Sequence, residues 1–467
     1  MLACSFQKDH KVFLRLAIAL FIACAYSRSV RADPANDQNW PAWRGPLATG
    51  ASPTADPPTT WSDTQNIKWK AEIPGEGTST PIVWGDRVFV LAAIDTGKRG
   101  QAATPAELPP PPDRGGGRRG RGGMGRGTPP SNVYQFVILC LDRKTGKLLW
   151  QQVAREEVPH EGRHPSEGSF ASPSPVTDGK NVYAFFGSRG LYCYDMDGKL
   201  QWSKDLGKMR IFLTFGEGSS PALCGDSLII NWDNEDGSFI TALDKSTGKT
   251  LWKTTRNEHT AWATPLIVDV GGKAQIVTIA TSKTRTYDAT SGKLLWEGPG
   301  LTRNVIPSPV AADGIAYVMS GYQGHSAMAI RLDKTADSNS SDPIVWKFGK
   351  KTPYVPSPLL YNGRLWFFAD NAEIVTCLEA KSGKPIIDGQ RIDGLLGVFA
   401  SPVAAAGKVY LIGRNGGVVV MKDGNEPKVI ATNHLDDKFD ASPALAGADL
   451  FLRGQHTLYC ISESAIQ

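Results

Sequence analysis

A sequence motif that is repeated along the whole chain most constrains its fold. Each copy opens with Pro, continues through a Gly-containing turn and a β-rich run, and in most copies ends with a Thr-Gly-Lys-like turn and Trp. The spacing is mostly about forty residues, which is the period of a four-stranded propeller blade. The repeat therefore predicts an all-β, eight-bladed β-propeller of four-stranded antiparallel blades. The opening prolines are Pro81, Pro175, Pro221, Pro265, Pro309, Pro358, Pro402 and Pro443.

The second copy of the motif shows how each repeat predicts the four strands of one blade. Residues 174–177 open an inner strand, where Pro is tolerated because it stands among the first residues. Asp and Gly at 178–179 suit a tight hairpin. Residues 182–186 are almost wholly apolar, as expected for a strand packed on both faces. Two further strands, 191–195 and 200–203, complete an antiparallel meander.

The two ends of the chain predict how the ring closes. The last copy ends after residues 458–461 and has no fourth strand, whereas residues 66–70 contain an outer-strand Trp with no blade before it. We therefore expect the N-terminal segment to supply the outer strand of the last blade. This arrangement leaves no open sheet edge.

The Asp-x-x-Thr-Gly-Lys-x-x-Trp phrase, seen at 142–150, resembles the PQQ-like (quinoprotein-type) repeat. Eight-bladed propellers with this repeat include quinoprotein alcohol dehydrogenases and the BamB-type lipoproteins of outer-membrane protein assembly. The sequences at 40–46 and 216–221 are also similar to those of secreted PQQ-like propellers of planctomycete bacteria. The resemblance covers about residues 40–467. It implies the blade architecture and does not by itself imply the cofactor.

The first 32 residues predict export. Basic residues precede a short apolar run at 16–25, which is shorter than the roughly 20 residues that span a bilayer. Val-Arg-Ala at 30–32 is a small-residue cleavage pattern, so we expect a signal peptide cleaved after Ala32 and a periplasmic or secreted protein. Lipidation at Cys24 is the alternative. No other segment is a transmembrane candidate.

Three further segments follow the signal peptide. Residues 33–60 form an N-terminal lead segment, and residues 61–467 form the propeller. Residues 93–133 interrupt the first blade with Pro, Gly and Arg runs that cannot bury apolar surface, so this insertion is predicted to be disordered. The formal net charge of +5 reflects the basic residues of the signal peptide and the insertion. No broad basic face for nucleic acid is implied.

Four cysteines stand at the same third-strand position of different blades: Cys140, Cys193, Cys377 and Cys460. Equivalent positions of neighbouring blades lie on the order of 10 Å apart, beyond the roughly 7 Å Cα limit for a disulfide. We therefore expect buried, unpaired thiols. The adjacent Cys-Cys pair that stacks on the quinone in alcohol dehydrogenases of the resembling family is absent.

The segment between the first two blades carries the most chemically active side chains. His160 and His164 could ligate a metal together with Glu161 or Glu167, although nearby Gly and Pro argue against a helix that would align the two His. Loops before the inner strands reach toward the channel. One ligand-binding funnel is therefore predicted, the alternative being side chains that cap strand ends and bind water. The candidates are His164, Glu167, Glu217, Trp262, Asn304, Tyr354 and Asp440.

The sequence also contains an acidic hairpin in the third blade, and it lacks the common catalytic motifs. Asp233, Glu235 and Asp236 could hold Ca²⁺, or form a solvated turn. No Gly-x-Ser-x-Gly elbow, His-Glu-x-x-His or phosphate loop is present.

We expect an exported, non-catalytic propeller that acts as a binding or scaffolding module for envelope proteins, as the BamB resemblance implies, and that needs no cofactor. One alternative is a quinoprotein oxidoreductase that holds PQQ and Ca²⁺ at the funnel. Another is a pore face that binds polysaccharide or peptide through Trp262 and Tyr354 without a metal. The sequence leaves the ligand and the oligomeric state open.

Overall fold

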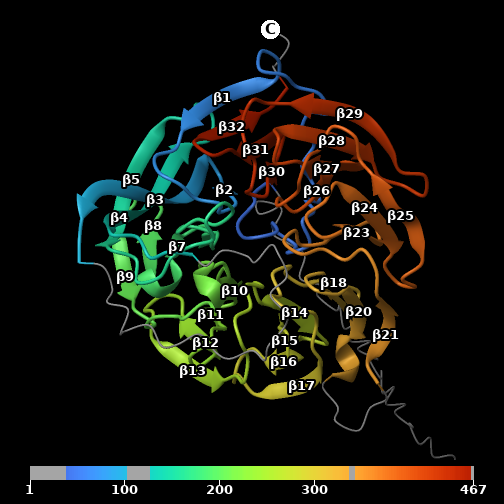
Figure 1. Cartoon of the computed structure of the whole chain (residues 1–467), viewed down its shortest axis with the longest axis horizontal. Helices are drawn as coiled ribbons and strands as arrows, with labels where there is room; N and C mark the ends of the chain where they lie inside the picture. Colours follow the sequence, from blue (N-terminus) through green and yellow to red (C-terminus); the bar gives the residue numbers. More distant parts are fainter. Residues whose placement is uncertain (1–37, 102–126, 336–341, 464–467) are drawn as a thin grey trace, which may run out of the picture.

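The computed structural model describes residues 38–101, 127–335 and 342–463. Its strands form eight four-stranded antiparallel sheets arranged around a central channel (Figure 1). The predicted eight-bladed propeller is therefore confirmed. No helix in this part of the chain is long and apolar enough to cross a membrane. The predicted signal peptide lies outside the described residues.

Blades one to four follow the chain order. Their strands are β2 (Ile82–Trp84), β3 (Arg87–Arg99), β4 (Asn132–Asp142) and β5 (Leu148–Glu157); β6 (Val176–Thr177), β7 (Asn181–Phe185), β8 (Leu191–Asp195) and β9 (Leu200–Lys204); β10 (Ala222–Cys224), β11 (Ser227–Trp232), β12 (Phe239–Asp244) and β13 (Thr250–Thr255); β14 (Leu266–Val270), β15 (Lys273–Ile279), β16 (Lys283–Asp288) and β17 (Leu294–Pro299). Short 3-10 turns occur at η2 (Gly187–Arg189) and η3 (Phe212–Thr214).

Blades five to eight repeat the plan. Their strands are β18 (Val310–Ala312), β19 (Ile315–Ser320), β20 (Ser326–Arg331) and β21 (Ile344–Phe348); β22 (Leu359–Tyr361), β23 (Arg364–Phe368), β24 (Ile374–Glu379) and β25 (Pro385–Arg391); β26 (Val403–Ala405), β27 (Lys408–Ile412), β28 (Gly417–Lys422) and β29 (Lys428–His434); β30 (Ala444–Ala446), β31 (Asp449–Arg453), β32 (Thr457–Ile461) and β1 (Ile67–Glu72). A further 3-10 turn is η4 (Leu332–Lys334).

Burial within a blade follows the sequence pattern. In blade two, β7 and β8 are buried over nearly their whole lengths, whereas β9 alternates between exposed and half-buried residues. The middle strands pack against the neighbouring blades on both faces, and the outer strand faces solvent at the rim of the ring. The apolar core is consequently divided into clusters, most of which join adjacent blades.

The predicted closure is confirmed. Strand β1 pairs antiparallel with β32, and Trp69 lies opposite Cys460. The eighth sheet therefore combines the first described strand with the last three, so the chain leaves no open edge between its ends (Figure 1).

The four aligned cysteines occupy the predicted place in their blades. Cys140, Cys193 and Cys460 lie opposite outer-strand Trp residues, and Cys377 lies opposite Ile387. All four are buried and free. Burial raises the pKa of Cys140, Cys193 and Cys377 to about 12, which keeps these thiols protonated and unreactive.

The strands of blade one extend into the segment predicted to be disordered. Strand β3 runs to Arg99 and β4 starts at Asn132, with Asp95 opposite Tyr134. The predicted boundary at 93–133 is therefore wrong at both ends, because the two strands continue to pair beyond the body of the blade. Residues 102–126 lie outside the described part of the chain.

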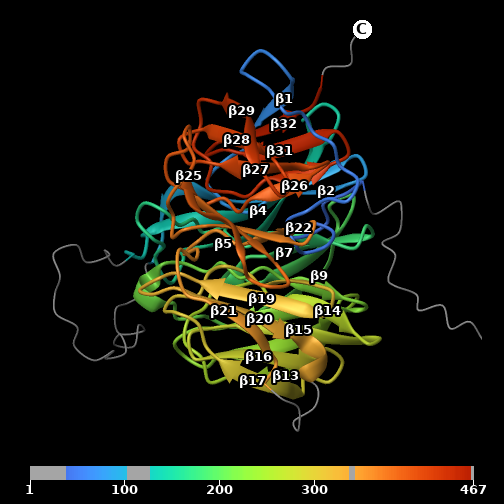
Figure 2. The same cartoon turned by 90° about the vertical axis from the view of Figure 1, so that its right-hand side faces the viewer.

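The lead segment crosses the centre of the ring (Figure 1, blue). Its backbone forms hydrogen bonds with inner strands or adjacent turns on opposite sides of the channel. These bonds are Trp40 N to Val83 O, Thr177 N to Pro41 O, Leu360 N to Thr49 O, Ala404 N to Gly50 O and Asp56 N to Gly447 O, all 2.9–3.0 Å. In the edge-on view of Figure 2 the blue segment lies beside β2 and β26. The lead segment thus plugs one end of the channel.

Glycines allow the plug to be compact. A Cβ at Gly45 would lie 2.7 Å from the Trp40 ring, and one at Gly50 would lie 2.1 Å from Nη2 of Arg44. Arg44 is buried, and its Nη2 donates to the carbonyls of Pro358 (2.8 Å) and Pro402 (2.9 Å). Arg44 therefore ties the plug to blades six and seven.

Candidate functional site

A cavity of about 200 Å³ lies in the channel. Loops that precede the inner strands of several blades form its wall. Six of the seven predicted funnel residues line it: His164, Glu167, Glu217, Trp262, Tyr354 and Asp440. Asn304 is buried and is not among the lining residues. We call this cavity the funnel.

The floor of the funnel comes from the lead segment. Trp43 lines the cavity, and its Nε1 donates to Oγ of Ser308 at 3.0 Å. The lead segment, which plugs the channel, therefore forms one end of the funnel. Sequence reasoning missed Trp43, although the Trp-Pro-Ala-Trp-Arg-Gly-Pro motif marked the segment.

A ring of hydroxyl groups surrounds the channel above this floor. The residue before each blade-opening proline is Ser or Thr, and from blade one to blade seven its backbone N–H donates to the hydroxyl of the equivalent residue in the next blade at 2.8–3.0 Å. The chain of bonds runs through Thr80, Ser174, Ser220, Thr264, Ser308, Ser357, Ser401 and Ser442. All except Thr80 line the funnel. The recurring Ser/Thr-Pro pair could have revealed this hydroxyl ring.

Aromatic side chains form much of the funnel wall. Trp262 is oriented by its Nε1, which donates to the Gly216 carbonyl at 2.7 Å. Tyr354 stacks on Tyr322 with ring centroids 4.7 Å apart, and burial raises the pKa of Tyr354 to about 12. Both rings are held before any ligand arrives, so the wall is preorganised.

Glu217 is held in a buried ion pair. Its carboxylate accepts from Arg189 Nη1 at 2.8 Å and from the Ser188 backbone N–H at 2.6 Å. Gly187 makes room for this contact, because a Cβ there would overlap the Glu217 carboxylate. The charge of Glu217 is therefore neutralised within the protein.

The second funnel carboxylate, Asp440, is also paired. Arg414 donates to both of its oxygens, from Nε at 2.5 Å and Nη2 at 3.0 Å, and Nη1 lies 3.8 Å from Glu167. The Arg414 guanidinium stands 3.9 Å over the Phe399 ring. Arg414 thus joins the loop before blade two to the loop before blade eight across the funnel mouth.

The two histidines have different surroundings. His160 is buried and its Nε2 donates to the Met209 carbonyl at 2.8 Å, while burial lowers its pKa. His164 packs edge-on against Phe215, with centroids 4.6 Å apart. Among the described residues no group of three or more His, Cys, Asp or Glu side chains is placed to hold a metal. Metal binding at His160 and His164 stays a prediction.

Glu161 lies in the same loop as the two histidines, and its pKa is raised. Its carboxylate is 3 % exposed and accepts from the Ile211 backbone N–H at 2.9 Å. Burial raises the pKa of Glu161 to about 7, and Glu217 contributes in the same direction. The mouth loop therefore contains an acid that changes charge near neutral pH.

The loop before β10 carries backbone strain at the funnel mouth. Leu213 and Thr214 adopt left-handed conformations with φ of 52° and 54°. Hydrogen bonds to the end of the blade-one insertion hold them: Gly127 N donates to Leu213 O at 3.0 Å and Thr214 Oγ1 donates to Gly127 O. Strain retained by such contacts is typical of functional loops.

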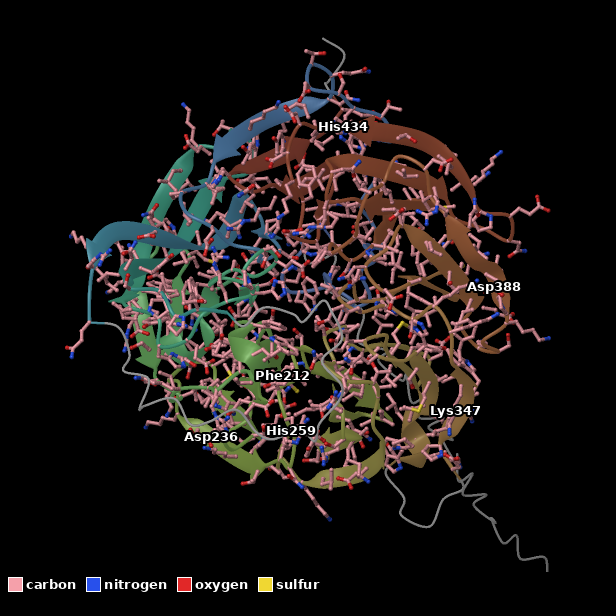
Figure 3. The ribbon with its side chains drawn as sticks, in the orientation of Figure 1. Phe212, Asp236, His259, Lys347, Asp388 and His434 are labelled. Atoms are coloured by element: carbon pink, nitrogen blue, oxygen red, sulfur yellow. The ribbon has the colours of Figure 1, made fainter. Side chains whose placement is uncertain are left out.

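Figure 3 shows residues near the funnel mouth and at the outer edge of the ring. Phe212, next to the strained pair, lies toward the middle of the ring. Lys347, Asp388 and His434, on outer strands, lie at its periphery.

The acidic hairpin of blade three is only partly a solvated turn. Asp233 is buried and accepts from Arg256 Nε at 2.7 Å and Nη2 at 2.9 Å. The buried Glu235 carboxylate accepts from the hydroxyl of Thr260 at 2.8 Å. Asp236 is exposed, as the predicted turn requires. The prediction of a solvated turn is therefore wrong for Asp233 and Glu235, which have buried partners.

Two of the three funnel carboxylates, Glu217 and Asp440, form close hydrogen bonds with arginines, and the third, Glu167, lies 3.8 Å from Arg414 Nη1. These arginines would compete with a calcium ion for the carboxylate oxygens. PQQ with Ca²⁺ stays an alternative, and we derive no step through it.

The fold resembles solved propellers of different activities. BamB from Moraxella catarrhalis aligns with a TM-score of 0.52 and 13% identity, covering 81% of this chain and 99% of that one. Quinohemoprotein alcohol dehydrogenase ADHIIG from Pseudomonas putida HK5 aligns with a TM-score of 0.54 and 10% identity, covering 93% and 83%. The computationally designed Ika8 protein gives 0.51 and 11%, covering 71% and 92%. At such identities the likeness shows the fold alone.

Comparison by sequence is more specific about the family. No curated protein matches the chain. The family described as outer membrane protein assembly factor BamB matches residues 135–387 and 236–465, which together make up more than half of the chain. The chain therefore belongs to the BamB-type family of PQQ-like repeat β-propellers.

Proposed function

We propose that this protein is an exported, non-catalytic binding module that docks envelope proteins with the loops around its funnel mouth. The proposal rests on one observation: the funnel side chains are already fixed in place, and most of them are engaged with partners inside the protein. Two of its three carboxylates, Glu217 and Asp440, are hydrogen-bonded to arginines, and the third, Glu167, lies 3.8 Å from Arg414. Its aromatic walls are fixed by their own contacts. Such a site favours recognition over proton transfer.

The rim of the mouth supports docking of a partner. Leu396 is 66 % exposed, the most exposed large apolar side chain of the described residues. Its backbone N–H is held by Asn415 Oδ1 at 3.0 Å, so the side chain is presented on an ordered loop. Three residues later Phe399 lines the funnel. Docking of a partner at the mouth would remove the apolar surface of this leucine from water.

Site-directed photo-crosslinking tests this proposal. A photoreactive side chain at Leu396 should give discrete adducts with identifiable envelope proteins in the periplasm. The control position is Val345 on the outer strand β21, which is 43 % exposed and remote from the mouth. Identical adducts from both positions, or none from Leu396, would contradict docking at the mouth.

The quinoprotein alternative has its own test. Propellers of this fold include a quinohemoprotein alcohol dehydrogenase. We expect no saturable change in quinone absorbance or Trp fluorescence when the mature protein is titrated with PQQ and Ca²⁺. Stoichiometric binding would overturn the proposal that the protein is non-catalytic and would call for a dye-linked substrate screen.

A further inference from the structure

A second cavity, of about 210 Å³, lies beside the funnel at the junction of blades eight and one. We call it the seam cavity. Charged side chains from both blades line it, including Glu76, Arg163 and Arg453. Thr78, Glu167, Gly168 and Asp440 line both cavities, so the seam cavity and the funnel are neighbours.

The most unusual group in the seam cavity is Arg453. This residue ends β31 and is only 2 % exposed. Its Nη1 donates to the carbonyl and the hydroxyl of Ser79, whereas its Nε has no partner among the described residues. Burial lowers the pKa of Arg453 to about 9. A buried guanidinium in this situation is stabilised by a negative counter-charge.

The carboxylates that line the seam cavity form ion pairs with cations other than Arg453. Glu76 accepts from Arg163 Nη2 at 2.7 Å. Asp440 accepts from Arg414, which also approaches Glu167. Lys438 adds a further positive charge 3.3 Å from Asp440. Among the described residues no carboxylate forms an ion pair with Arg453, although the cavity lining as a whole balances three cationic side chains against three carboxylates.

The backbone is shaped to bring Arg453 to the cavity. A Cβ at Gly77, which also lines the cavity, would lie 2.3 Å from Arg453 Nη2 and 2.7 Å from the Leu91 carbonyl. By contrast, the equally buried Arg44 donates from Nη2 to three backbone carbonyls and lines neither cavity. Arg453 is therefore distinguished by its access to a cavity.

We propose that the seam cavity binds a carboxylate at Arg453 and that an apolar substituent of the same ligand occupies the adjoining funnel. A planar guanidinium suits a planar carboxylate. The funnel offers Phe215 and Trp262 to the apolar part. Two sources share this chemistry, a free aromatic acid and the carboxy terminus of a polypeptide. The inference goes beyond docking of envelope proteins, since it requires no protein partner.

Calorimetry with three probes tests the proposal. Phenylacetate represents the free acid, N-acetyl-Gly-Phe represents a polypeptide terminus, and N-acetyl-Gly-Phe-amide lacks the carboxylate. Both acids should bind saturably, and the amide should bind at least about tenfold more weakly, because it loses a charge-assisted hydrogen bond. Binding of N-acetyl-Gly-Phe alone would assign the site to polypeptide termini. Equal binding of the amide, or no binding by either acid, would overturn the proposal.

Substitutions at Arg453 test whether the acids bind at the seam cavity. Arg453→Met should abolish binding of both acids, and Arg453→Lys should retain part of it because the charge remains. The control is Lys350→Met, which removes a positive charge at the outer rim, where Lys350 pairs with Asp388 at 2.6 Å. Unchanged acid affinity in Arg453→Met would overturn the assignment. Crosslinking from Leu396 should be the same in Arg453→Met, so failure of this proposal is distinguishable from failure of docking at the mouth.

Discussion

The indole ring of Trp150 lies against Gly198 of the next blade. A Cβ at Gly198 would be 2.7 Å from the ring, and Trp150 Nε1 donates to the Met196 carbonyl of the same turn at 2.9 Å. The arrangement recurs at other junctions, in the pairs Trp69–Gly146, Trp202–Gly248, Trp252–Gly292 and Trp346–Gly383. The Thr-Gly-Lys and Trp elements of the repeat are therefore two halves of one contact between blades.

The first prediction concerns this contact. Gly198→Ala should lower the free energy of unfolding by about 2 kcal/mol or more, because the methyl group meets the indole in a position that also has φ of 84°. Gly314→Ala is the matched control, with φ of 73° and open space around its Cβ. It should lose only about 1 kcal/mol. Denaturant unfolding measures both, and equal losses would refute a role for the Trp contact.

The repeat made most of the architecture predictable. The missing fourth strand after residues 458–461 and the unattached Trp69 together predict the pairing of β1 with β32. This inference works because each blade must satisfy its sheet edges locally, so a missing strand in one copy has to be supplied by another part of the chain. The almost wholly apolar run at 182–186 likewise predicts a strand that is packed on both faces.

The floor of the funnel was beyond sequence reasoning. Residues 33–60 carry no repeat, so nothing in their pattern shows that Trp43 enters the channel or that Arg44 bonds to blades six and seven. Asn304 stands before an inner strand like the other candidates, yet with φ of 52° it is buried beside the wall residue Tyr354 and does not line the funnel. Loop conformation, which no periodicity encodes, decided both outcomes.

The second prediction contrasts two buried arginines. Arg256→Met leaves the buried Asp233 carboxylate without its cation and should cost about 3–5 kcal/mol of stability. Arg453→Met removes a buried charge that has no carboxylate partner among the described residues, but it also removes the donor to the buried Ser79 carbonyl and hydroxyl. Without ligand it should therefore cost at most about 1–3 kcal/mol, less than Arg256→Met.

Urea unfolding of the two variants alongside the wild type makes this comparison. A loss at Arg453 as large as that at Arg256 would mean that a carboxylate or another essential partner already satisfies Arg453 in the folded protein.

The third prediction is a pH dependence. The pKa of Glu161 is about 7 in the folded protein, above its ordinary value of 4.5, so the folded state binds more protons than the unfolded state between these values. Stability contributed by protonated Glu161 is therefore present below pH 4.5 and is lost as the pH rises toward 7, by about 3 kcal/mol at most.

Glu161→Gln should remove this slope. The amide stays neutral and its oxygen can still accept from the Ile211 backbone N–H. The unfolding free energy of the variant should exceed that of the wild type increasingly from pH 5 to pH 8. Parallel pH profiles for the two proteins would show that Glu161 is already ionised in the fold.

The last prediction concerns the hydroxyl ring. Ser308 Oγ accepts from two donors, the Thr264 backbone N–H and Trp43 Nε1, both at 3.0 Å. Ser357 Oγ accepts from the Ser308 backbone N–H at 2.8 Å. Each donor left without a partner in a buried site costs about 1–3 kcal/mol. Ser308→Ala should therefore lower stability more than Ser357→Ala in calorimetric unfolding, although by less than a factor of about two because Trp43 is only half-buried. It should also change the Trp fluorescence, because Trp43 loses the bond that holds the plug to blade five. Equal losses without a fluorescence change would show that Trp43 is held in the channel by packing alone.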